Sequence, residues 1–128
     1  MFGGDIEDAA ASVIYAVLTQ DLGWRVDTLS RSWQAWDGRP MEIDLFGRAE
    51  DPAHPGQPIW IVGEAKINLT ARQVDRFATL AARARRHLSG RVFPLCFCYR
   101  ARPEVQQRVV DSGLNLVFSF GRLVPAAP

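Results

Sequence analysis

The chain has 128 residues, of which 48% are hydrophobic and 23% are charged, and its formal net charge of +1 does not by itself indicate a nucleic-acid partner. A chain of this size can build one hydrophobic core, so a single domain over residues 1–128 is expected, and the composition excludes collagen, long disorder and disulfide-dense small scaffolds. No run reaches the roughly 18 apolar residues of a membrane span, and the first residues carry acids where a signal peptide carries bases, so we expect a cytoplasmic protein without a membrane segment.

The first predicted element is a helix over residues 5–21. Its apolar residues recur at helical spacing, and Gly23 follows as a stop signal. Glu7 falls on the edge of the apolar stripe, whereas Asp5 and Asp8 point away from it. Glu7 is therefore the unusual acid of the three, explained either by a favourable interaction with the helix N-terminus or by a function.

Three strands are predicted next, over residues 24–31, 41–48 and 59–67. The first two alternate in polarity and flank a turn region that contains Asp37-Gly38, a hairpin signal, with a connection longer than a two-residue turn. The third follows a loop rich in Pro and Gly and is an apolar run typical of a strand in a sheet interior. These segments predict a meander.

A second helix is predicted from the N-cap Thr70 to a stop at Ser89-Gly90, because apolar residues recur there at helical spacing. Four arginines fall close together on its other side and form a basic stripe. This stripe is either a solvated face or a contact for nucleic acid, and it consists of Arg72, Arg76, Arg83 and Arg86.

The remaining elements are a strand over residues 92–99, a short helix over 103–112 and a strand over 114–120, with residues 122–128 as a loose tail. The order is helix, three strands, helix, strand, helix, strand. A meander followed by strand-helix-strand crossovers predicts an α/β fold, with a mixed sheet and helices on both faces.

The two cysteines, Cys96 and Cys98, lie two positions apart in an apolar run and would share one face of a strand. This pattern predicts buried free thiols. The alternative is a zinc site, but the only histidines, His54 and His87, show none of the usual ligand spacings.

Charged residues interrupt the second and third predicted strands. Residues two apart share a face of a strand, so Glu64 and Lys66 project together, away from Ala65. On the second strand the same rule places one set on each face: Glu42, Asp44 and Phe46 on one side, and Met41, Ile43 and Leu45 on the other. Lys66 is also the only lysine among the 15 Lys and Arg residues.

This cluster has a specific chemical use. Two carboxylates from neighbouring strands, Asp44 and Glu64, supply the oxygen ligands that Mg²⁺ accepts. A lysine beside them can position or deprotonate a water, or stabilise charge on a phosphate. Together these groups are the parts of metal-dependent phosphodiester hydrolysis. The alternative is a structural salt bridge between Glu64 and Lys66 at the end of a strand.

The segments Glu42-Ile43-Asp44-Leu45 and Ile61-Val62-Gly63-Glu64-Ala65-Lys66 resemble the PD-(D/E)XK nuclease superfamily. Its pattern is an acid, a variable interval and then (D/E)-X-K, and here 20 positions separate Asp44 from Glu64. The predicted element order also matches the core of that family over nearly the whole chain. The resemblance implies a restriction-endonuclease-like mixed sheet flanked by helices, in the order αβββαβαβ, and the chain looks most like an uncharacterised bacterial branch.

The resemblance also implies roles for single residues. Asp44 and Glu64 would be ligands of Mg²⁺ or Mn²⁺, with the carbonyl of Ala65 as a further ligand. Lys66 would stand beside the attacking water. Glu7 would be an outer or alternative ligand, because branches similar to archaeal Holliday-junction resolvases place an acid on the first helix facing the metal.

A further candidate is Gln73, which stands where several relatives carry a helix glutamine near the site. Those relatives end that motif with tyrosine, and this sequence has Phe77 instead. The basic stripe of the second helix, or the turn that carries Trp33 and Trp36, would contact the nucleic acid, with one indole as readily part of the core.

Three hypotheses follow from the sequence. The first is a Mg²⁺-dependent endodeoxyribonuclease that leaves 5′-phosphate ends and has DNA as its partner. The second is a catalytically silent nuclease-fold module that binds nucleic acid or assembles without turnover, in line with the near-neutral charge. The third is a purely structural domain with a salt-bridged strand end. The resemblance further suggests a homodimer and a coiled-coil segment that precedes the module in a longer chain.

Overall fold

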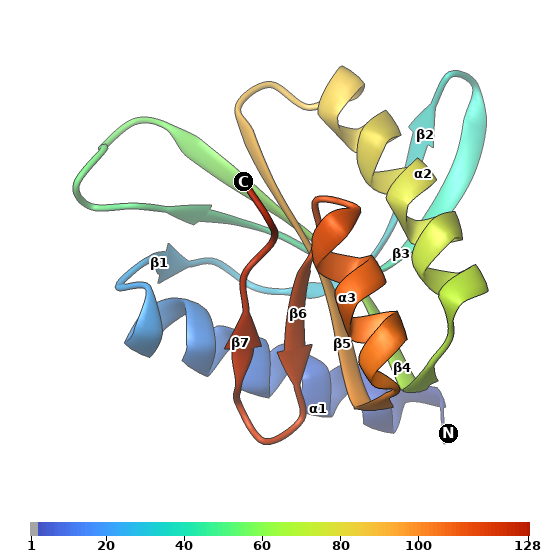
Figure 1. The fold of residues 1–128 in the computed structure, drawn as a ribbon. Coiled ribbons are helices and arrows are strands. Elements are labelled where there is room, and N and C mark those ends of the chain that lie inside the picture. Colours follow the sequence, from blue (N-terminus) through green and yellow to red (C-terminus); the bar gives the residue numbers. More distant parts are fainter. Residues whose placement is uncertain (1–2) are drawn as a thin grey trace.

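The computed structural model describes residues 3–128, with the side chains of residues 3–5 left out of the description. Helices and strands follow each other in an order close to the predicted one (Figure 1). The helices are α1 (Gly3–Ala16), which continues into a π-helical turn over Val17–Asp21, α2 (Ala71–His87) and α3 (Pro103–Asp111). The strands are β1 (Arg25–Val26), β2 (Ser30–Trp36), β3 (Arg39–Glu50), β4 (Pro58–Leu69), β5 (Arg91–Ala101), β6 (Asn115–Phe118) and β7 (Leu123–Val124).

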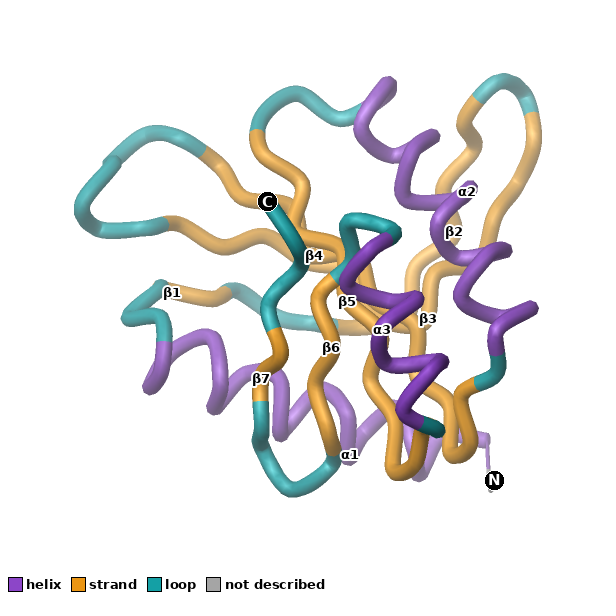
Figure 2. The backbone as a smooth tube through the Cα atoms, viewed as in Figure 1, coloured by secondary structure: helices purple, strands orange, loops and turns teal. Residues whose placement is uncertain are grey.

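All seven strands form one mixed sheet in the order β1-β3-β4-β5-β6-β7, and β2 pairs with β3 beyond this path. Strands β3 and β4 are antiparallel, whereas β4, β5 and β6 are parallel and are joined by crossovers through α2 and α3. Helix α1 lies behind the sheet and α2 and α3 lie in front of it in Figures 1 and 2. The predicted α/β fold with helices on both faces is confirmed.

Alternation along β4 divides the core into two layers. Ile59, Ile61 and Ala65 are buried in the layer that contains α1, whereas Val62 is buried in the layer that contains α2 and α3. The apolar run that predicted an interior strand is therefore covered on both faces, as expected for a strand with parallel pairing. This strand carries Glu64 and Lys66 beyond its apolar part.

The hairpin between β2 and β3 is tighter than predicted. Trp36 pairs with Arg39, so Asp37 and Gly38 alone form the turn, and both have positive φ, 57° and 72°. This conformation is the one that matches strand twist in a two-residue hairpin, and Asp-Gly supplies it. The expectation of a longer connection was wrong, and the predicted strand over residues 24–31 is divided between β1 and the start of β2.

The C-terminal tail is not loose. Strand β7 pairs antiparallel with β6, with Leu116 opposite Val124. After β7, Ala126 donates its N–H to the side chain of the buried Asn115 at 2.9 Å, and Ala127 donates to the carbonyl of Val110 at 3.1 Å. The prediction of a frayed tail was wrong, because the side chain of the buried Asn115 accepts a hydrogen bond from this segment. This contact cannot be read from the sequence of the tail itself.

The predicted burial of the cysteines is confirmed, since Cys96 and Cys98 are free and buried in the layer on the α2 side. In residues 3–128 no helix is both long enough and apolar enough to cross a membrane.

Candidate active site

The candidate site lies where strands β3 and β4 separate. Their pairing runs from Glu50↔Pro58 to Leu45↔Gly63, yet β3 extends back to Arg39 and β4 continues to Leu69. Beyond Gly63, β4 stays paired with β5, so it is β3 that diverges from β4, while it stays paired with β2. A position for charged groups is thereby opened at the end of an otherwise buried strand pair.

An irregularity in β3 causes this departure. Two steps along β2, from Ser30 to Ser32, correspond to three steps along β3, from Phe46 to Ile43. An extra residue of this kind is a β-bulge, which bends the strand and changes which face its side chains take. Asp44 lies within the bulge, between Ile43 and Phe46.

The bulge also corrects the predicted faces of β3. Ile43 and Phe46 both pack in the layer on the α2 side, whereas Leu45 packs in the layer on the α1 side. Strict alternation had placed Ile43 with Leu45 and opposite Phe46. The rule failed here because it holds only for a regular strand.

Asp44 is held against β4 by a backbone hydrogen bond. Its Oδ2 accepts the N–H of Ala65 at 3.0 Å, which brings the carboxylate beside the segment Glu64–Lys66. Burial raises the pKa of Asp44, the Ala65 N–H opposes the shift, and the negative charge of Glu7 adds to it. The site thus holds one carboxylate in a place where its charge is costly.

Glu64 is the second carboxylate. It pairs in register with Cys96 of β5, and its Oε2 is buried without a hydrogen-bond partner among the described residues. Burial raises the pKa of Glu64, the positive charge of Lys66 opposes this, and the charge of Asp44 raises it further. A buried carboxylate oxygen without a partner is expensive, so this oxygen is well suited to accept a cation.

Lys66 stands two residues further along β4 and pairs in register with Cys98, on the same face as Glu64. Its side chain is half-buried, and its charge lowers the pKa values of both Asp44 and Glu64. The structure therefore brings together the three residues of the predicted motif. Their roles in chemistry stay a prediction.

Glu7 lies on the other side of this group, on α1. Its carboxylate accepts a hydrogen bond from the Arg31 guanidinium of β2, which also pairs with Glu42 of β3 at 3.1 Å. Glu7 is close enough for its charge to raise the pKa of Asp44. Glu7 thus lies near the site, as expected, but its carboxylate is already paired with Arg31.

Gln73 stabilises the start of α2. Its Oε1 accepts the N–H of Thr70 at 3.0 Å, and its own N–H donates to the Thr70 hydroxyl at 3.3 Å, which completes a capping box. The predicted N-cap is confirmed. The side-chain oxygen of Gln73 is therefore already used in the N-terminal cap of α2. Phe77 is buried in the core.

The basic stripe on α2 is divided by the fold. Arg72, Arg76 and Arg86 are exposed, and the charge of Arg76 reaches the site, since it lowers the pKa of Glu64. Arg83 differs from the prediction, because it is only 20% exposed, lies 3.7 Å from Asp37 and donates to the sulfur of Met41 at 3.2 Å. It fastens the hairpin to α2 and leaves three arginines for a partner.

The two tryptophans of β2 have opposite environments. Trp33 is 64% exposed, whereas Trp36 is buried and stacks on His87 of α2. Both lie in the strand and not in the turn. Of the two predicted stacking indoles, one is therefore part of the core.

Sequence reasoning missed Arg31 and Glu42 as members of this group. The Asp37-Gly38 turn contained the information that could have placed Arg31 there. A two-residue turn pairs Trp36 with Arg39, and counting back along both strands places Arg31 close to Asp44.

The donor set fits a hard divalent cation. Among the side chains of residues 6–128, no three His, Cys, Asp or Glu groups converge on one point. Asp44 and Glu64 nevertheless offer two carboxylates, and the carbonyl of Ala65 lies between Glu64 and Lys66 in the chain. Mg²⁺ is commonly held by one or two carboxylates plus waters and substrate oxygens, so the unpartnered oxygen of Glu64 is chemically suited to it.

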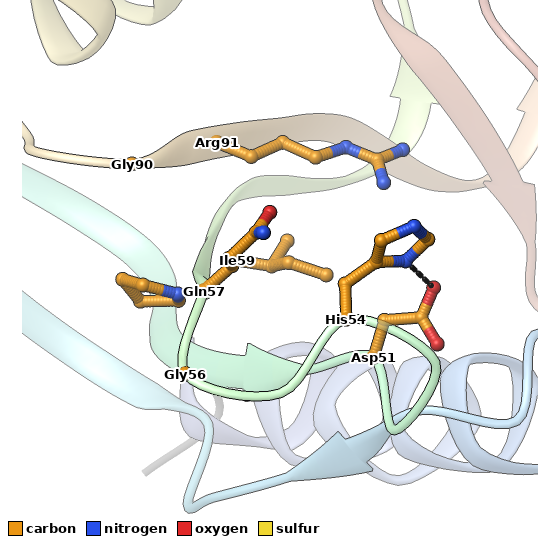
Figure 3. A pocket seen from close by; sticks show the side chains of 8 residues that line it. Asp51, His54, Gly56, Gln57, Ile59, Gly90 and Arg91 are labelled. Carbon is orange, nitrogen blue, oxygen red and sulfur yellow. Dashed lines mark hydrogen bonds and ion pairs between the residues drawn. The ribbon is translucent and has the colours of Figure 1, made fainter.

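A cavity of about 410 Å³ lies at the opposite end of β4. Figure 3 shows His54 turned toward Asp51, with Arg91 extended above them and Ile59 behind. Its other lining residues are Gly56, Gln57, Pro58 and Gly90. The cavity is separated from the carboxylates by the length of the strand, so it is not part of the candidate site.

Comparison with known proteins gives a likeness of fold. No protein-family model matches the chain, and no curated protein matches its sequence. The MspJI restriction endonuclease, solved in complex with a 27-mer oligonucleotide, superposes with a TM-score of 0.53 and 18% identity over 88% of this chain and 24% of that one. EndoMS in its apo form gives a TM-score of 0.46 and 9% identity over 83% of this chain and 44% of that one. The chain thus has a restriction-endonuclease-like fold and spans about a quarter of the MspJI chain.

Proposed function

We propose that this domain is a metal-dependent nuclease that hydrolyses phosphodiester bonds of DNA. The observation that carries the proposal is the buried, unpartnered Oε2 of Glu64 beside Asp44 and Lys66. The fold supports it, because it is that of a restriction endonuclease solved with an oligonucleotide. Fold alone does not define chemistry, so the proposal depends on these three side chains.

Asp44, Glu64 and the carbonyl of Ala65 would hold Mg²⁺ or Mn²⁺. When bound, the ion would polarise a phosphate oxygen and lower the pKa of a water. Burial disfavours the negative charges of Asp44 and Glu64, and a bound cation would compensate them. The hydrogen bond from Ala65 N–H keeps the Asp44 carboxylate in place.

Lys66 would bring a positive charge to the scissile phosphate. As a compact ammonium on a flexible stem, it can follow the charge that develops as the phosphate is attacked, or orient the attacking water. Cleavage on the side that leaves a 5′-phosphate is expected from the resemblance. The charge of Lys66 lowers the pKa values of both Asp44 and Glu64, so the ammonium is near both carboxylates.

The exposed arginines of α2 would bind the backbone of the nucleic acid. Arg76 is the one whose charge reaches Glu64, and Arg72 and Arg86 extend the contact along the helix. Phosphate contacts of this kind release counterions, so affinity should fall steeply with salt. Cutting both strands of a duplex often uses two such sites, which a homodimer would supply.

The test is a cleavage assay with purified protein, Mg²⁺ or Mn²⁺, and plasmid, single-stranded and branched DNA. We expect cleavage that EDTA abolishes and that Lys66→Ala and Asp44→Asn each reduce on the order of 100-fold or more. His54→Ala, in the distant cavity, serves as the matched control. Equal residual activity in all variants, with folding intact by circular dichroism, would identify a contaminant and contradict the proposal.

The second candidate is a nuclease-fold module that binds nucleic acid without turnover. It is favoured by the engagement of Glu7 with Arg31 and of Gln73 with Thr70, which leaves only two carboxylates for a metal. Titration calorimetry with Mn²⁺ separates the two candidates. A silent module shows no saturable metal binding, and it retains salt-dependent DNA binding that Arg76→Ala weakens.

A further inference from the structure

The carboxylate site contains a positive charge that the sequence motif does not include. Arg31 of β2 donates to Glu7 of α1 and lies 3.1 Å from Glu42 of β3, so one guanidinium joins three elements. Planar guanidinium groups suit such a bridge between two carboxylates. Arg31 is 45% exposed at its side chain, whereas Glu7 is only 19% exposed.

We propose that Arg31 permanently neutralises Glu7, so that the site of Asp44 and Glu64 binds one divalent cation per chain and not two. The inference rests on the proposed function, because it concerns the metal stoichiometry of the same site. Two ions side by side require several carboxylates to share them. Here the only further acid whose charge reaches Asp44, apart from Glu64, is already paired.

The electrostatic surroundings of Asp44 agree with this arrangement. The charge of Glu7 raises the pKa of Asp44, and the charge of Arg31 lowers it. The two effects oppose each other, as expected when an acid and a base of one ion pair both lie near a third group. Arg31 thus supplies Glu7 with a fixed positive charge, so this carboxylate has no need of a metal ion to balance it.

The experiment is a Mn²⁺ titration of the purified chain by calorimetry, with bound Mn²⁺ counted by electron paramagnetic resonance. Wild type is expected to bind one ion. Arg31→Met should add a second ion or tighten binding about tenfold, since it removes a neighbouring positive charge. Arg31→Lys should keep a single ion, and Arg31→Met combined with Glu7→Gln should return to one.

Two further variants keep the test decisive. Arg122→Met removes the same charge from an exposed residue of the β6–β7 connection that has no ion pair with the side chains of residues 6–128, and it should change nothing. Glu7→Gln alone leaves the charge of Arg31 uncompensated, so it should keep a single ion and weaken its binding, and the double variant should restore the affinity of wild type.

Each result has one meaning. Two ions in wild type, a double variant that binds its ion more weakly than wild type, or equal behaviour of Arg31→Met and Arg122→Met would overturn the inference. In each of these cases the proposed function survives, because the chain still binds a metal. No saturable binding of Mn²⁺ by wild type would instead remove the proposed function, and the inference with it.

Discussion

The two ends of β4 differ in how their charged groups are satisfied. At the Pro58 end, Asp51 accepts the N–H of Ala53 at 3.0 Å and faces His54 at 3.4 Å, and the nearby Arg91 guanidinium stacks 5.2 Å from the centre of the Trp24 ring. A cavity is present there, but its acid is paired. At the Glu64 end a buried oxygen has no partner among the described residues.

This contrast shows that a buried polar group without a hydrogen-bond partner is a better guide to a chemical site than a surface cavity. The pKa values of the acids show the same contrast. Hydrogen bonding from Ala53 lowers the pKa of Asp51, whereas burial raises the pKa values of Asp44 and Glu64. Groups whose charge is disfavoured by their environment are the ones to expect at a functional site.

The largest expected effect separates the two ends by activity. Glu64→Gln should reduce metal-dependent cleavage on the order of 100-fold or more, because it removes a charged ligand. His54→Ala combined with Arg91→Ala changes the distant cavity and should leave the cleavage rate within about twofold. Both rates are measured on the same plasmid substrate. A comparable loss in the double variant would mean that the cavity belongs to the site.

A pair of glycine substitutions sharpens the comparison. A Cβ at Gly63 would lie 3.3 Å from the Cβ of Leu45 and 3.4 Å from Leu95, so Gly63→Ala should push β3 away from β4 beside Glu64. We expect a loss of about 1–2 kcal/mol in stability and a clear loss of Mn²⁺ affinity.

The matched control is Gly56→Ala at the other end of the strand. Gly56 has a φ of +80° and open space around it, so the substitution strains the backbone without displacing a neighbour. It should also cost about 1 kcal/mol, but leave Mn²⁺ affinity unchanged. Urea unfolding and calorimetry provide the two measurements. Equal effects on metal binding would show that lost stability, and not geometry, controls the site.

The smallest expected effects concern how the stability of the fold depends on pH. Asp44 and Glu64 have raised pKa values in the folded state, so the stability they contribute is present when they are protonated and is lost as the pH rises through those values. Glu64→Gln should therefore raise the Tm at neutral pH without metal, by roughly 2–5 °C. It should also abolish the further rise that Mg²⁺ gives to wild type.

For Asp51 the pH dependence of stability should have the opposite sign to that for Asp44 and Glu64. Its pKa is lowered in the folded state, so its contribution is present above the unfolded pKa and is lost as the pH falls through the folded one. Asp51→Asn should accordingly lower the Tm slightly at neutral pH and converge with wild type in acid. Thermal scans between about pH 2 and pH 8 reach the acid range in which Asp51 is protonated. A higher Tm in Asp51→Asn at neutral pH would contradict this reading of the cavity end.

Much of the fold could be predicted from the sequence, because it depends on local patterns. The apolar run over residues 59–67 became β4, and Thr70 became the N-cap of α2. Periodicity and capping act over a few residues, so they are visible in the chain itself. The same holds for Glu64 and Lys66, whose common face follows from their spacing on a regular strand.

The sequence by itself therefore determined the alternation of elements and the spacing that brings two carboxylates and a lysine onto neighbouring strands. Only the tertiary structure decided that β3 has a bulge near Asp44 and that the C-terminal tail pairs with β6. It also decided that Arg83 contacts Asp37 of the hairpin and that Arg31 forms an ion pair with Glu7. The physical reason is range. Local patterns depend on neighbours along the chain, whereas a bulge, an ion pair between α1 and β2, and an oxygen left without a partner depend on which distant groups the packing brings together.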